Sequence, residues 1–138
     1  TTAVERAVKI GAERGAKRSV MLPVSAPFHC ALMQPAADAI EKALAETTIA
    51  PPSVPIIANV SADEVRDPET IRTNLVSQVT ARVRWRESVV CLKEKGVDTL
   101  VEAGAGKVLS GLARRIDREL SSTSIQGYED IEAFLGSL

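Results

Sequence analysis

The residues best suited to chemistry in this 138-residue chain lie around its only histidine, His29. The imidazole follows an apolar stretch over 18–24 and precedes the strongest helical pattern of the sequence. The positive end of such a helix disfavours the imidazolium, so we expect a neutral ring that can accept a proton. A general base needs that property. A loop histidine that makes structural hydrogen bonds fits the same pattern, and spacing alone leaves both interpretations open.

Two other patterns are better explained by structure than by chemistry. The run Gly104-Ala105-Gly106-Lys107 has neither the spacing of a P-loop nor that of a dinucleotide-binding fingerprint, so we interpret it as a tight turn between a strand and a helix. The basic cluster over 82–86 is interpreted as a solvated face, with Val83 and Trp85 packed inward. An acidic protein partner could use its arginines.

Composition excludes several classes of function. Seventeen basic residues stand against 18 acidic ones, which gives no electrostatic reason to expect a nucleic-acid partner or an anionic membrane surface. No apolar run reaches the roughly 18 residues of a membrane span. Cys30 and Cys91 lack C-x-x-C spacing, so we expect packing cysteines in a reducing cytoplasm, with no metal site and no cofactor.

Apolar periodicity predicts the elements that position these residues. Strands followed by helices predict an α/β fold with a parallel sheet, in which functional side chains gather after the carboxyl ends of the strands. The helical pattern is already under way at the first residues, which suggests a fragment of a longer protein. We expect strands over 18–24, 54–60 and 97–103, and helices from the first residues to about Gly15 and over 31–47, 68–78, 85–95, 107–120 and 128–135.

Four blocks of the sequence, in order, resemble the malonyl-CoA:acyl-carrier-protein transacylases of fatty-acid synthesis. The segment L-P-V-S-A-P-F-H-C-A-L-M (22–33) closely resembles the histidine motif of that family. It is followed by V-P-I-I-A-N-V (54–60), L-V-S-Q-V-T-A-R-V-R-W-R-E-S-V (75–89) and L-V-E-A-G-A-G-K-V-L-S-G-L (100–112). In the last block Ala105 replaces the usual proline. The resemblance covers essentially residues 1–120.

The resemblance implies a fold and a reaction. Residues 1–24 would be the end of a small ferredoxin-like subdomain, and residues 25–138 the C-terminal part of a large, hydrolase-like α/β acyltransferase subdomain. The implied reaction moves a malonyl group from malonyl-CoA to the phosphopantetheine thiol of acyl carrier protein through an acyl-serine intermediate.

The resemblance also implies roles for three residues. His29 matches the histidine that takes the proton of the serine, and Gln78 matches the glutamine whose backbone carbonyl orients that histidine. Phe28 matches the Phe-His pair of malonyl-selective enzymes, whereas methylmalonyl-selective relatives usually carry Ser-His. A bulky ring could fill the space that a substrate α-methyl needs. Alternatively, Phe28 only packs the loop.

The nucleophile of the family is missing from this sequence. Its G-H-S-x-G elbow has no match, and Ser110, the nearest candidate, lies within a helical pattern. The oxyanion loop and the arginine that pairs with the malonyl carboxylate also have no counterpart. We therefore expect the chain to supply the histidine half of a site and to be inactive alone. The alternatives are an acyltransferase domain of a larger fatty-acid or polyketide synthase, or a noncatalytic α/β interaction module.

Overall fold

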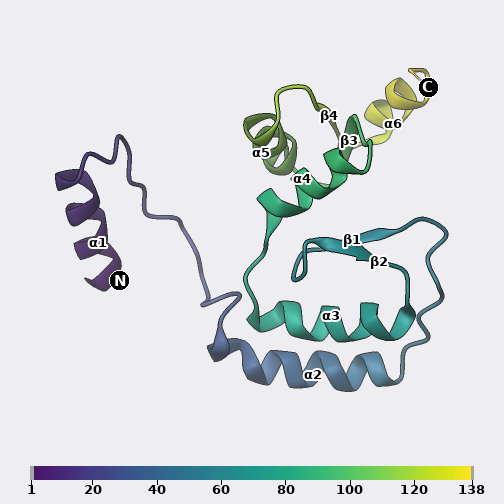
Figure 1. Cartoon of the computed structure of the whole chain (residues 1–138), viewed down its shortest axis with the longest axis horizontal. Helices are drawn as coiled ribbons and strands as arrows, with labels where there is room; N and C mark the ends of the chain where they lie inside the picture. Colours follow the sequence, from purple (N-terminus) through teal and green to yellow (C-terminus); the bar gives the residue numbers. More distant parts are fainter. Residues whose placement is uncertain (1, 138) are drawn as a thin grey trace.

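The computed structural model describes residues 2–137 as an α/β arrangement of helices with two small sheets (Figure 1). The elements in chain order are α1 (Thr2–Glu13), a 3-10 turn (Ala31–Met33), α2 (Gln34–Ala45), β1 (Ile56–Ala58), β2 (Asp63–Val65), α3 (Pro68–Thr80), α4 (Trp85–Glu94), β3 (Thr99–Ala103), α5 (Val108–Ile116), β4 (Ser121–Ile125) and α6 (Tyr128–Leu135).

The elements form two groups, with α1 standing apart from both (Figure 1). In one group α2 and α3 lie side by side, and the antiparallel hairpin β1–β2 lies near α3. In the other group β3 and β4 pair in parallel, with Thr99 opposite Ser121, and α5 packs against both strands. The 3-10 turn that follows His29 contacts α3. This contact brings the histidine loop to the helix that carries Gln78.

Helix α3 begins where the sequence predicts, for an identifiable reason. The Asp67 side chain accepts hydrogen bonds from the backbone N–H of Thr70 (2.8 Å) and from its hydroxyl (2.7 Å). These bonds hold the pKa of Asp67 below its ordinary value, the hydroxyl contributing most. Pro68 occupies the first turn, where its missing N–H has no intrahelical partner to lose.

The hydrophobic core is small for a chain of this length. Among the described residues, the buried apolar side chains are Ala37, Val65, Val89, Ala113 and Leu120, and only Val89 is both larger than alanine and fully enclosed. Many large apolar side chains are open to solvent, among them Leu22, Val24 and Leu32. None of the described helices combines the length and the apolar character that crossing a bilayer requires.

The predicted helices are confirmed, with one shortened. The elements α2, α3, α4 and α6 agree with the expected ranges within about three residues. Helix α5 was expected to reach residue 120 but ends at Ile116, because Asp117 adopts an extended backbone (φ −140°, ψ 122°). The expected turn after α1 is present, with Gly15 at φ 89°.

Two of the three predicted strands are present, but only one of them pairs as expected. Residues 18–24 form no strand and are exposed. The expected parallel strand over 54–60 is the short β1, which pairs antiparallel with β2. Only the strand expected over 97–103 is a parallel strand, β3, and its partner β4 was not predicted because its sequence, S-S-T-S-I, carries little apolar signal. A small parallel sheet is therefore present, built from different strands than expected.

Candidate active site

His29 occupies a tight turn whose backbone is unusual for its residue type. Its φ is +57°, in the left-handed region, which histidine adopts more readily than bulky or β-branched residues. Two hydrogen bonds stabilise the turn: the N–H of Phe28 donates to the carbonyl of Ala26 (2.9 Å), and the Cys30 thiol donates to the carbonyl of Pro27 (3.1 Å). Cys30 is thus a hydrogen-bonding part of the turn, beyond the packing role expected for it.

The ring of His29 has one hydrogen-bond partner that decides its tautomer. Its Nδ1 lies 3.0 Å from the backbone carbonyl oxygen of Gln78, 49 positions along the chain. A carbonyl oxygen can only accept, so Nδ1 carries the proton in this contact. In a neutral imidazole, Nε2 then holds the lone pair, which is the state that a general base requires. The contact implied by the family resemblance is present, while the catalytic roles of His29 and Gln78 stay predictions.

The Gln78 carbonyl is available because α3 ends just after it. The last helical hydrogen bond runs from the N–H of Ala81 to the carbonyl of Ser77 (3.0 Å), and Ala81 itself is extended. The carbonyls of the final turn therefore have no intrahelical donor. One of them binds His29.

The helix after His29 is farther away than the sequence suggests. The 3-10 turn Ala31–Met33 lies between His29 and the first residue of α2, Gln34. The electrostatic effect of a helix terminus falls off within about one turn, so the expected effect of this helix end on the imidazolium is weakened. The ring is oriented by its hydrogen bond to the Gln78 carbonyl.

Phe28 lies mostly exposed beside the histidine. Its side chain is 58% exposed. Its ring is therefore accessible from solvent. Its role in selectivity stays a prediction.

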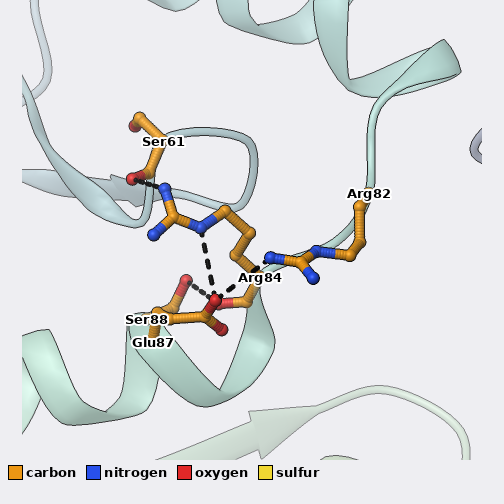
Figure 2. Close-up of polar contacts among 5 residues, drawn as sticks. All are labelled: Ser61, Arg82, Arg84, Glu87 and Ser88. Atoms are coloured by element: carbon orange, nitrogen blue, oxygen red, sulfur yellow. Dashed lines mark hydrogen bonds and ion pairs between the residues drawn. The ribbon is translucent and has the colours of Figure 1, made fainter.

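Arginines of the basic cluster, which we expected to be solvated, make contacts within the chain (Figure 2). The guanidinium of Arg84 donates to the Ser61 carbonyl (2.8 Å) and pairs with Glu87 (3.4 Å), which also pairs with Arg82 (3.4 Å). The expectation that Val83 packs inward is wrong, because the side chain is 37% exposed. The carbonyl at Ser61 belongs to the loop after β1, so Arg84 ties that loop to the start of α4.

The glycine run is a structural turn. Gly104 and Gly106 have φ of 135° and 98°, which side chains rarely adopt. The turn brings the Glu102 carboxylate to the start of α5, where it accepts from the N–H of Leu109 (3.1 Å) and from the N–H (2.9 Å) and hydroxyl (2.8 Å) of Ser110. These bonds, the backbone bond from Ser110 foremost, hold the pKa of Glu102 below its ordinary value. The helix end is thus already occupied by an anion, and Ser110 is engaged inside a helix.

Sequence reasoning missed Glu102 and Gln126 as parts of this turn. The Gln126 side-chain oxygen accepts from the N–H of Gly106 (3.2 Å). A carboxylate two residues before a glycine turn and a helix was the available signal for Glu102, whereas nothing local marks Gln126. Across residues 2–137 no group of three or more His, Cys, Asp or Glu side chains is arranged to hold a metal ion.

Comparison with known proteins gives matches in both sequence and structure. No family model matches the chain. The chain is 41% identical to the malonyl CoA-acyl carrier protein transacylase of Bacillus subtilis (strain 168), over 98% of this chain and 43% of that protein. The acyl-carrier-protein S-malonyltransferase structure from Bartonella henselae matches with a TM-score of 0.88 and 53% identity, over 99% of this chain and 43% of the other.

A further similar structure contains a carrier protein. The malonyl-transacylase PlMCAT, solved in complex with the type II PKS acyl-carrier protein AntF, matches with a TM-score of 0.89 and 39% identity, over 100% of this chain and 45% of the other. The chain therefore spans less than half the length of the relatives it matches. The matched region is their C-terminal part.

Proposed function

Because this chain belongs to the malonyl CoA-acyl carrier protein transacylase family, whose C-terminal part it matches, we propose that it supplies the histidine half of a malonyl-transfer site. The acyl group moves from malonyl-CoA to the phosphopantetheine thiol of acyl carrier protein, in the cytoplasm. The observation that supports this proposal is the 3.0 Å contact between Nδ1 of His29 and the Gln78 carbonyl, because it leaves Nε2 as the basic nitrogen.

The reaction divides into two acyl transfers with one base. A serine outside these 138 residues attacks the malonyl thioester while His29 Nε2 takes its proton, and the coenzyme A thiolate leaves with that proton. The incoming phosphopantetheine thiol then gives its proton to Nε2 and attacks the acyl-serine. The serine oxygen leaves and takes the proton back. Each half-reaction returns His29 to its neutral state.

The orienting partner is a neutral carbonyl rather than a carboxylate. It fixes the tautomer and the ring direction as an aspartate does in a hydrolase triad, but it stabilises the transient imidazolium less. Thioesters are reactive acyl donors with a good leaving group, so the transfer does not need the stronger stabilisation of the imidazolium that a carboxylate would give. Phe28, adjacent to the base and exposed, would contact the malonyl group and disfavour an α-methyl substituent.

We further propose that the chain contains parts of two subdomains. Helix α1 and the extended stretch after it, up to residue 24, would be the end of a ferredoxin-like subdomain. Residues 25–138 would belong to a hydrolase-like α/β subdomain. The separation of α1 from the other elements supports a boundary in this region (Figure 1).

The test joins the chain to the missing half. The N-terminal part of the Bacillus subtilis relative is fused to this chain, and malonyl transfer from labelled malonyl-CoA to acyl carrier protein is measured. We expect transfer by the fusion, none by the chain alone, and a loss of about 10²–10⁴-fold in His29→Ala. Glu41→Gln, on the exposed face of α2, is the control and should keep full transfer. Undiminished transfer by His29→Ala, or a stable malonyl adduct on the chain alone, would refute the proposal.

A further inference from the structure

Gln78 takes part in the site through two separate groups. Its backbone carbonyl accepts the hydrogen bond from His29. Its side-chain Nε2 donates to the carbonyl of Ala81 (3.0 Å), three positions along the chain. The first bond would be available to any residue type. The second requires a side-chain donor of this length.

The second bond bears on the first because both depend on where α3 ends. If α3 continued by one more bond, the N–H of Arg82 would reach the Gln78 carbonyl, four positions earlier, and would compete with His29 for it. The helix stops because Ala81 is extended (φ −94°, ψ 155°). The Gln78 amide binds the carbonyl of Ala81 in that orientation and so stabilises the exit of the chain from the helix.

The segment that leaves α3 is also held at its other end. The backbone N–H of Arg84 donates to the Asn59 carbonyl (3.0 Å), and its guanidinium donates to the Ser61 carbonyl (2.8 Å; Figure 2). Residues 81–84 are therefore anchored to α3 by Gln78 and to the loop after β1 by Arg84. With both anchors in place, the N–H of Arg82 is kept from turning back toward α3.

The surroundings of Gln78 favour an apolar side chain. The residue lines a cleft between the β1–β2 hairpin and α3 whose walls are mostly apolar, including Ile57, Ile71 and Leu75. Within the described residues its Oε1 is buried without a donor. Burying an amide there costs free energy unless the amide is hydrogen-bonded. The bond from Nε2 to the Ala81 carbonyl offsets part of that cost.

We propose that the Gln78 side chain is a positioning residue for His29. By binding the Ala81 carbonyl it keeps its own backbone carbonyl free, and that carbonyl holds His29 as the Nδ1–H tautomer. The relevance to catalysis rests on the proposed function, but the geometric effect does not.

The chain allows a direct test because His29 is its only histidine. We would label the histidine with ¹⁵N and record magic-angle-spinning NMR spectra at a pH where the imidazole is neutral. These spectra report the tautomer of that one ring even if the chain self-associates. We expect Nδ1–H in the parent chain. In Gln78→Met, which keeps the length but removes the donor, the Nδ1–H signal should give way to the tautomer mixture of an unrestrained imidazole.

Two further variants separate a positioning effect on His29 from a general loss of structure. Gln126→Met makes the same change at another glutamine bonded to backbone, 3.2 Å from the N–H of Gly106, and should leave the tautomer unchanged. In Gln78→Met/Arg82→Pro, the proline removes the competing N–H and disfavours a helical Ala81, so Nδ1–H should return. This double variant also decides the outcome if Gln78→Met alone does not fold.

Retention of Nδ1–H in Gln78→Met, or its failure to return in the double variant, would overturn the positioning role. Malonyl transfer by the fusion is a separate readout. A fusion that fails to transfer malonyl groups while the tautomers behave as expected would refute the proposed function but not the positioning role.

Discussion

The chain exposes far more surface than a folded polypeptide of its mass normally does. Its accessible surface is 10280 Å² for 14.7 kDa, whereas the scaling of monomeric proteins gives roughly 6,900 Å². The excess of roughly 3,300 Å² exceeds what one partner contributes to a standard-size protein interface, about 800 Å². Together with exposed apolar residues such as Leu22, Val24 and Leu32, it indicates that more polypeptide normally covers this surface.

The excess sets the expected size of an unfolding signal. An unfolded chain of this mass exposes roughly 21,000 Å², so an ordinary fold buries roughly 14,000 Å² and this one roughly 11,000 Å². The denaturant dependence of the unfolding free energy, the m-value, is proportional to that area. We therefore expect an m-value in urea about one quarter below that of an ordinary 138-residue domain.

The assay compares the chain alone with the fusion described above. Urea unfolding followed by circular dichroism gives the m-value, and sedimentation velocity gives the association state. The chain alone should unfold with a shallow transition and self-associate as its concentration rises, since exposed apolar surface is buried by any available copy. The fusion should be discrete and unfold steeply. A monodisperse monomeric chain with an m-value normal for its length would refute this reasoning.

Three further predictions concern single residues. Val89→Ala, at a fully buried position, should lower the free energy of unfolding by about 1.5–2.5 kcal/mol; Val108→Ala, at a 68% exposed position, is its control, and equal midpoints in urea for both variants would contradict the assigned core. The stabilisation by Glu102, whose pKa in the fold is lowered from 4.5, is present above pH 4.5 and is lost as the pH falls through the lowered pKa. Glu102→Gln should therefore be less stable than the parent at pH 7 and converge with it in acid, and a pH-independent difference would exclude this account. Phe28→Ser in the fusion should raise the kcat/KM for methylmalonyl-CoA relative to malonyl-CoA by about 10–200-fold, and an unchanged ratio would leave Phe28 without a role in selectivity.

Helices were predictable from the sequence because their signals are local. Asp67 and Pro68 mark the start of α3 by a side-chain cap and a fixed φ, both within one turn. The only substantial error, the length of α5, comes from Asp117, where the backbone becomes extended although the apolar pattern continues.

Strands were less predictable because a strand needs a partner. Residues 18–24 have the composition of a strand, but no described segment pairs with them. The polar β4 is a strand only because β3 and α5 lie beside it. Arg114 supports it from α5 by donating to the hydroxyl (3.1 Å) and carbonyl (2.6 Å) of Ser122.

The site was predictable only in part. A lone histidine in a loop carries no information about a carbonyl 49 positions away, and only the family resemblance connected His29 with Gln78. The left-handed backbone of His29 and the side-chain bond of Gln78 to Ala81 depend on three-dimensional packing. No periodicity in the sequence encodes them.

Within residues 2–137, His29, the proposed base, is held by groups of this chain. Its turn is closed by two hydrogen bonds within residues 26–30, and its ring is held by α3. The exit from α3 is held by Gln78 and Arg84. None of these contacts requires the nucleophile. Under the proposed function, Nε2 of His29 is therefore oriented before a serine arrives, and joining the two halves has only to bring the serine to Nε2. The tautomer of His29 should accordingly be the same in the chain alone and in the fusion.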